Sequence, residues 1–315
     1  MSKTWTGSNG GFRNGHNWSP DGAPTVGDGL TIAEGTARLR GGSFGSADAQ
    51  TTISLTGYAD RPASLLVANA TLTNVAINES APDYNALKTG TLAIKGHVVN
   101  DGGSFVAAGN GPQHSNHGGN VLDIEMQPGA KLVNEGVIRA DPGTSVNIDG
   151  SDGRVENDGA IGAYGGTVTI ASRLTGTGDV VSSENMMLGG SVELKSAVGA
   201  GQTVHLDRGT VQIDAPQSFL GSLDIPAYRG FATLEGLGAT SWATDGNLLE
   251  LFNGSGALAD TVRLAPQATP VDLKVSAITD PTYGQGVLIS AAPPGGSSLF
   301  GPSLPQQCFV PPTLT

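Results

Sequence analysis

The chain has 315 residues and a net charge of −12, with 48 Gly, 14% charged and 5% aromatic residues. Its 16 Lys and Arg are scattered singly along the sequence, which disfavours nucleic-acid binding because successive phosphates must be neutralised together. No window approaches the roughly 18 apolar residues of a membrane helix. The first residues lack the apolar stretch of a Sec-type signal peptide, and a single cysteine permits no internal disulfide.

Residues 1–32 are predicted to form an N-terminal cap. They contain two of the three tryptophans, Trp5 and Trp18, in a Gly- and Asn-rich setting. A solenoid exposes an apolar cross-section at each end, so bulky side chains are needed to cover it.

Residues 33–214 are predicted to form stacked coils, because one short pattern recurs along them. A glycine is followed by a hydroxyl residue and by apolar residues that alternate with polar ones, in "GTLAI", "GTVTI", "GSVEL" and "GTVQI". Alternation with a period of two is typical of a strand with one buried face. The last three copies begin at Gly166, Gly190 and Gly209.

A second pattern reads apolar, Asn, acid, Gly and contains Asn100, Asn134 and Asn157. Asn134 and Asn157 are 23 residues apart, as are Gly136 and Gly159. We expect Asn and Gly to form corners, where they tolerate left-handed backbone. We also expect each Asn to hydrogen-bond its copy in the next coil.

These repeats predict a right-handed parallel β-helix with a loop inserted near residues 109–120. An antiparallel β-sandwich also has short strands and frequent turns, but recurrence in register favours the β-helix. Residues 215–291 keep the strand alternation and are predicted to form a C-terminal β cap. Residues 292–307 are a Pro/Gly/Ser linker.

Two segments resemble bacterial surface proteins of the autotransporter-passenger type. They are "TWTG" with "NWSPDGAPTVGDGLTI" near the start, and the stretch from "LTGTGDVV" to "GLGATS". The likeness covers residues 1–32 and roughly 130–290. It implies a parallel β-helical, extracellular or cell-surface protein, although the route of export stays open.

The last residues, "CFVPPTLT", resemble the start of a Hint (hedgehog/intein-type) autoprocessing domain. The resemblance implies that Cys308 would attack the carbonyl of Gln307. Pro312 replaces the expected glycine and fixes the backbone, and the Thr and His elements that activate the thiol lie far downstream in that family. We therefore expect residues 308–315 to be a remnant without self-cleavage; an incidental tail cysteine is the alternative.

Few residues suggest reactive chemistry. His114 and His117 have the spacing of a metal-binding pair, but two histidines in a Gly/Asn loop are more often solvated. Asp149 and Asp152 are weak candidates for polysaccharide hydrolysis, which needs two carboxylates at a defined separation; beside glycine, Asp more often makes turns. The segment at 147–159 offers a weak calcium-binding alternative.

We expect a non-enzymatic extracellular or cell-surface structural or adhesive protein without a cofactor. Its expected partners are further copies, in filaments or a matrix, or surface polysaccharide. The alternatives are a carbohydrate-active β-helix, such as a polysaccharide depolymerase or phage-type spike, and a sugar-binding module without turnover. The sequence leaves the contacted surface undetermined.

Overall fold

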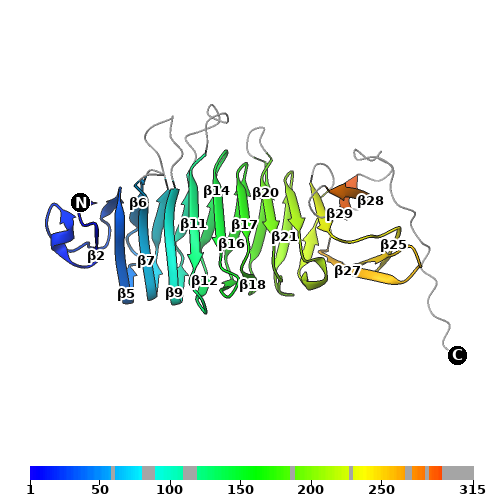
Figure 1. The fold of residues 1–315 in the computed structure, drawn as a ribbon, viewed down its shortest axis with the longest axis horizontal. Helices are drawn as coiled ribbons and strands as arrows, with labels where there is room; N and C mark the ends of the chain where they lie inside the picture. Colours follow the sequence, from blue (N-terminus) through cyan, green and yellow to red (C-terminus); the bar gives the residue numbers. More distant parts are fainter. Residues whose placement is uncertain are drawn as a thin grey trace.

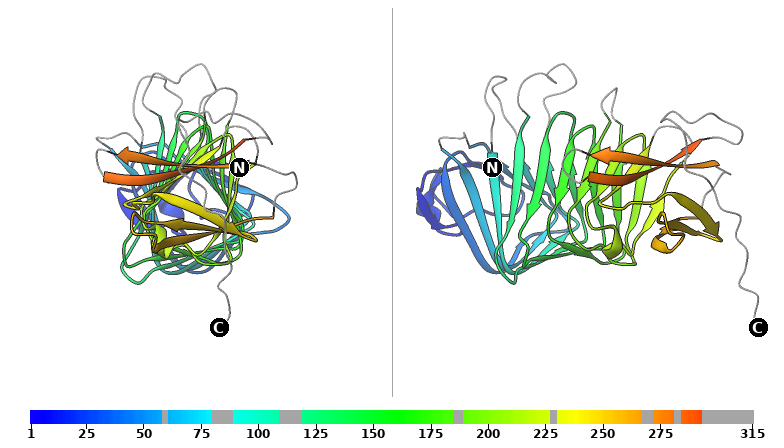
Figure 2. Two further views of the ribbon diagram at one scale, coloured as in Figure 1. Left: turned by 90° about the vertical axis from the view of Figure 1, so that its right-hand side faces the viewer. Right: turned by 45° about the vertical axis from the view of Figure 1, so that its right-hand side comes forward.

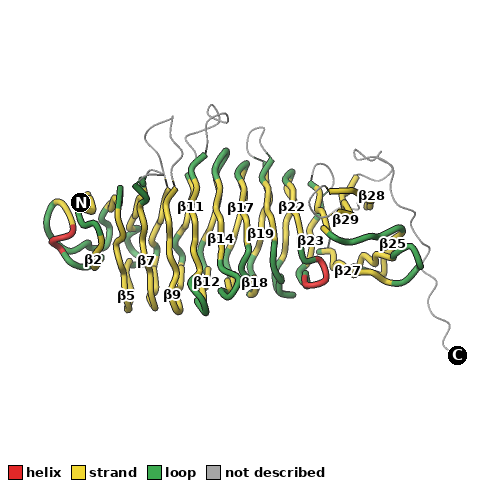
Figure 3. Tube along the Cα trace, viewed as in Figure 1, coloured by secondary structure: helices red, strands yellow, loops and turns green. Residues whose placement is uncertain are grey.

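The computed structural model describes residues 1–57, 61–79, 89–108, 119–184, 189–226, 230–266, 272–280 and 284–292. This part of the chain is all-β and forms two long sheets that run along one axis of an elongated body (Figure 1). Within the described residues, two 3-10 helices lie toward opposite ends of the body (Figure 3). These helices are η1 (Gly15–Asn17) and η3 (Pro216–Ser218).

One sheet has 14 strands, and its central strands pair in parallel with neighbours from the preceding and following coils. The strands of this 14-stranded sheet are β1 (Ser2–Trp5), β3 (Trp18–Ser19), β4 (Gly29–Ile32), β6 (Thr51–Leu55), β8 (Val75–Glu79), β10 (Ser104–Ala107), β13 (Val137–Ala140), β16 (Ala160–Tyr164), β19 (Asp179–Ser183), β21 (Thr203–Asp207), β23 (Ser222–Asp224), β25 (Ser241–Asp245), β26 (Leu248–Phe252) and β27 (Leu258–Leu264).

The other sheet has 15 strands. They are β2 (Asn9–Gly11), β5 (Gly35–Gly45), β7 (Ala63–Thr73), β9 (Thr89–Asp101), β11 (Val121–Met126), β12 (Lys131–Asn134), β14 (Ser145–Asp149), β15 (Arg154–Asn157), β17 (Thr167–Ile170), β18 (Arg173–Thr175), β20 (Ser191–Leu194), β22 (Thr210–Ile213), β24 (Phe231–Glu235), β28 (Asp272–Asp280) and β29 (Gly284–Ala292). The first half of β9 pairs with β11 and its second half with β12. From β11 onward, two short strands therefore replace each long one.

Strands β12, β13 and β14 form one coil, and β15, β16 and β17 pair with them in the same order. This arrangement fits the predicted β-solenoid, whose cross-section is seen end-on in Figure 2. The parallel pairing of the central strands excludes the antiparallel β-sandwich.

Aliphatic side chains form columns between the sheets. The strand register pairs equivalent residues of successive coils, so each aliphatic side chain lies next to its counterpart on the adjacent strand. One column contains Leu92, Ile124, Ile148, Ile170 and Leu194, all at most 1% exposed. The polar residues that alternate with them point outward. The predicted alternation is thus confirmed.

Buried amides form a hydrogen-bonded ladder beside these columns. Asn100, Asn134 and Asn157 are paired in register and fully buried. The Nδ2 atom of Asn100 donates to Oδ1 of Asn134 over 2.7 Å, and Asn134 donates to Asn157 over the same distance. Asn157 donates in turn to Oε1 of Gln202 at 3.0 Å. The predicted stacking of asparagines is confirmed, and Gln202 extends it.

The repeated glycines are needed for a different reason from the one predicted. Gly136, Gly159, Gly166, Gly190 and Gly209 are not among the residues with positive φ. Instead, a Cβ on Gly136 would lie 2.1 Å from the carbonyl oxygen of Gly103, and one on Gly159 would lie 2.1 Å from that of Gly136. At these glycines, the backbone lies so close to that of the preceding coil that no side chain has room.

At the N-terminal end, Trp5 and Trp18 are buried and meet edge to face, with ring centroids 5.2 Å apart. Phe12 packs edge to face on Trp18, whose indole nitrogen donates to the Phe12 carbonyl oxygen at 2.7 Å. Strand β3 pairs antiparallel with β1 and is the last strand of the 14-stranded sheet here. These aromatic side chains lie in the segment for which the sequence predicts an N-terminal cap.

At the other end, parallel pairing continues past the predicted boundary at residue 214, to β23 and β24. Antiparallel pairing begins at β29, which pairs with β24 and β28, and in β25–β26–β27. Ala292, placed in the linker by sequence, is the last residue of β29. The rest of the predicted linker and residues 308–315 lie outside the described residues.

The close approach of the coils predicts the effect of a single methyl group. Gly136→Ala should lower the free energy of unfolding by about 2–3 kcal/mol, because the Gly103 carbonyl oxygen is backbone and cannot move aside alone. Urea denaturation would measure this. Gly29→Ala is the matched control, since no atom lies within 4 Å of its added Cβ; equal destabilisation of the two variants would contradict the explanation.

Candidate functional site

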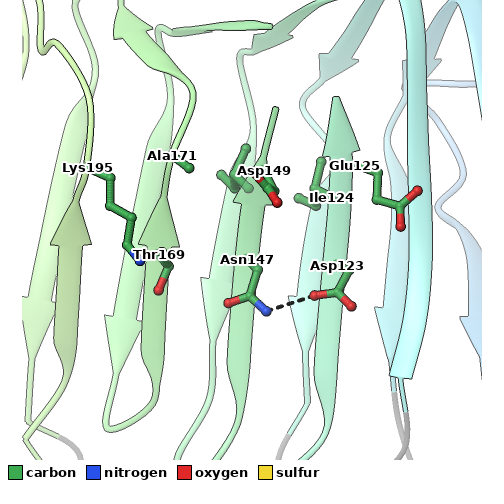
Figure 4. A pocket seen from close by; sticks show the side chains of 9 residues that line it. Asp123, Ile124, Glu125, Asn147, Asp149, Thr169, Ala171 and Lys195 are labelled. Carbon is green, nitrogen blue, oxygen red and sulfur yellow. Dashed lines mark hydrogen bonds between the residues drawn. The ribbon is translucent and has the colours of Figure 1, made fainter. Parts of the chain in front are cut away.

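A polar groove crosses four successive coils on the outer surface of the 15-stranded sheet (Figure 4). Its volume is about 500 Å³. The groove is lined by strands β11, β14 and β17 and by the residues directly after β17 and β20. The groove is lined by Asp123, Ile124, Glu125, Asn147, Ile148, Asp149, Thr169, Ala171 and Lys195.

Strand register orders the polar side chains of the groove into two rows. Asp123, Asn147 and Thr169 are paired on adjacent strands, and Nδ2 of Asn147 donates to Oδ1 of Asp123 at 2.8 Å. Two positions further along the strands, Glu125 is paired with Asp149. The groove therefore presents acceptors at intervals of one strand, about 4.8 Å.

The groove carries a cation at the end opposite Glu125 (Figure 4). The Nζ atom of Lys195 lies 3.2 Å from Oε1 of Glu193, and the Thr169 hydroxyl donates to the other oxygen of that carboxylate at 3.3 Å. Carboxylates, an amide, a hydroxyl and an ammonium group together offer both donors and acceptors. Such a surface suits a ligand with many hydroxyl groups.

The structure separates the two aspartates that the sequence suggested for catalysis. Asp149 lines the groove, whereas Asp152 lies in the exposed turn between β14 and β15 and is not part of the lining. Glu125 and Asp149 are exposed.

Two aspartates close to Asp149 in the sequence form contacts with their own surroundings. Asp158 accepts hydrogen bonds from the backbone nitrogen and the hydroxyl of Thr177, at 2.8 and 3.0 Å. Asp141 lies 3.1 Å from Nε of Arg139. Burial raises the pKa of Asp141, and the Arg139 guanidinium opposes this rise.

The predicted metal pair, His114 and His117, and the processing cysteine Cys308 lie outside the described residues. Within the described ranges, no three or more His, Cys, Asp and Glu side chains are grouped so as to hold a metal ion. Within the same ranges, no helix is long and apolar enough to span a bilayer.

Sequence reasoning missed a charged cluster on the 14-stranded sheet. His205 of β21 lies between two carboxylates, with Nδ1 2.8 Å from Oδ2 of Asp224 and Nε2 3.1 Å from Oδ1 of Asp179. Both ring nitrogens can donate only in the imidazolium form. Partial burial lowers the pKa of His205, but the two carboxylates outweigh it and raise the pKa above 6.5.

This cluster predicts a pH-dependent contribution to stability. Because the pKa of His205 is raised on folding, its contribution is fully present below pH 6.5 and is lost as pH rises through the folded pKa. In urea denaturation between about pH 5.5 and pH 8.5, the free energy of unfolding of the wild type should decline as the pH rises. His205→Gln should remove part of that decline. His16→Gln is the control, because His16 and its partner Asp21 are 85% and 66% exposed. An unchanged pH profile for His205→Gln would refute this role.

Compared with known proteins, the chain matches no protein-family model and no curated protein.

Proposed function

We propose that the chain is a right-handed parallel β-helix that acts as a non-enzymatic structural or adhesive element outside the cell. The observation that carries this proposal is the in-register parallel pairing from β4 to β24, which runs along one axis of the body. Coils stacked in this way make a stiff rod, because each strand is hydrogen-bonded to both neighbours.

The outward side chains support a role in contact. Because equivalent residues are paired on adjacent strands, outward side chains line up across the coils. The rod therefore presents rows of polar groups. Thr91, Asp123, Asn147, Thr169 and Glu193 form one such row. A repetitive polar surface suits multivalent contact with another repetitive surface.

The ends of the 14-stranded sheet favour a rod of defined length over an end-to-end filament. Strand β3 closes one end and β25–β27 the other, and these terminal strands pair antiparallel with their neighbours, except for the parallel contact of β27 with β23. The edge strand β3 has only two residues, and a short edge strand limits the strand pairing between molecules that a long open edge invites.

Two measurements test the structural role. Small-angle scattering of the purified chain should give an elongated, rod-like distance distribution; a compact globular profile would contradict the coiled architecture. Antibody labelling and external protease treatment of intact cells of the source organism should detect and remove the protein. A chain that stays protected until the cells are broken would contradict a role outside the cell.

A second candidate function is sugar binding without turnover at the polar groove. It is favoured by the convergence of Asp123, Asn147, Asp149 and Lys195 on one depression of about 500 Å³. Alternating acceptors and a cation match the hydroxyl groups, or the occasional carboxylate, of an extended polysaccharide that runs along the rod.

A glycan array followed by calorimetry would test the groove. The double variant Asn147→Ala/Lys195→Ala should weaken binding of any captured glycan about tenfold or more, because two direct polar contacts are lost. The control Asp245→Ala changes an exposed residue of β25, remote in sequence from the groove, and should bind like the wild type. Equal binding by all three proteins would exclude the groove, and release of reducing sugar would indicate a hydrolase instead.

A further inference from the structure

The strand segments β9, β12 and β15 share a charge pattern that register turns into two opposite rows. Their sequences read "HVVND", "KLVNE" and "RVEND": a basic residue, three residues that include the ladder asparagine, then an acid. The basic residue is the first of each five-residue segment and the acidic residue is the last. The basic row is His97, Lys131, Arg154 and Arg173; the acidic row is Asp101, Glu135 and Asp158.

The two rows bound one narrow outer face, defined here as the charged face. Between them lies a middle row of Val99, Val133, Glu156 and Thr175. His97, Arg154, Arg173, Glu135 and Asp158 are exposed. Although the cations are scattered singly in the sequence, the fold places them on adjacent strands, about 4.8 Å apart.

A face with one basic and one acidic edge is complementary to itself. A two-fold rotation about an axis parallel to the rod places the basic row of one copy opposite the acidic row of another, layer by layer. Lys131 then faces Glu135, and Arg154 faces Asp158, on both sides of the axis. A rotation about an axis across the rod would instead oppose rows of like charge. Charge therefore selects a parallel, side-by-side arrangement.

The middle row permits close approach of the two faces. Val99 and Val133 would meet their own copies at the axis, and they carry no charge. The acid of this row, Glu156, already forms an ion pair with Nζ of Lys131 in the same chain. That pair reduces repulsion between the two copies of Glu156.

We propose that two copies of this chain associate laterally, in parallel, through their charged faces. This inference deepens the proposed structural function by naming a second copy as the partner, and it rests on that function. Four layers at about 4.8 Å and five residues at about 3.3 Å make a face roughly 15 Å on each side. The area of this face is less than the ~800 Å² that each partner buries in a stable complex. The association is therefore weak, salt-sensitive and strongest where copies are concentrated on a surface.

Charge-swapped variants provide the test. Sedimentation velocity of the wild type over a concentration series should show reversible dimers at low ionic strength, weakened about tenfold or more at ~0.5 M salt. Lys131→Glu/Arg154→Glu and Glu135→Lys/Asp158→Lys should each stay monomeric, since each opposes like charges. An equimolar mixture of the two should restore association as heterodimers, because all four facing pairs again have opposite charges.

The control variant Arg139→Glu/Arg263→Glu makes the same change in net charge as Lys131→Glu/Arg154→Glu, but through exposed side chains of the 14-stranded sheet. It should dimerise like the wild type. Circular dichroism confirms folding, and if Lys131→Glu/Arg154→Glu unfolds, the single exchanges Arg154→Glu and Asp158→Lys make the same comparison. A monomeric wild type, or a mixture that fails to associate, would overturn the inference. Either result would leave the rod shape and the location outside the cell, which test the proposed function, unaffected.

Discussion

The spacing between hydrogen-bonded parallel strands is the constraint on which the rest of this structure depends. It holds successive coils about 4.8 Å apart wherever β-strands pair, so any side chain at a repeated position must suit its own copy as a neighbour. Aliphatic residues meet this condition by stacking into columns. The buried asparagines meet it because an amide both donates and accepts, so Asn134 bonds to Asn100 on one side and to Asn157 on the other. Glycine is required where two backbones approach more closely still.

Sequence reasoning recovered what repeats locally and missed what depends on neighbouring coils. Alternating apolar residues predicted the inward columns, and the interval from Asn134 to Asn157 predicted their contact. Gln202 was missed because it reaches the ladder from outside the asparagine pattern. The crowding of Gly136 against Gly103 was missed because a sequence carries no inter-coil distance. The polar groove combines residues from four coils, and its polar side chains are of ordinary surface types. No single sequence segment therefore predicts it.

The outward surface divides into regions of different chemistry although one backbone plan underlies it. The groove presents oxygen-rich side chains in two rows, while the 14-stranded sheet holds His205 between two carboxylates. Two aspartates close in sequence differ in their surroundings: Asp149 faces the groove, and Asp158 accepts hydrogen bonds from Thr177. These differences arise from outward positions, which can vary without disturbing the columns inside. Such freedom explains how a scaffold with a highly repetitive interior can carry several distinct surfaces.

The equivalence of Lys131 and Arg154 has a consequence for how such a chain can change in length. These residues begin consecutive coils in the same register, so the segment 131–153 is one complete structural unit. A genetic duplication of that segment would add a layer whose upper and lower surfaces already match those of its neighbours. The molecule could thus lengthen by whole layers without new packing contacts, while the terminal strands at both ends stayed the same.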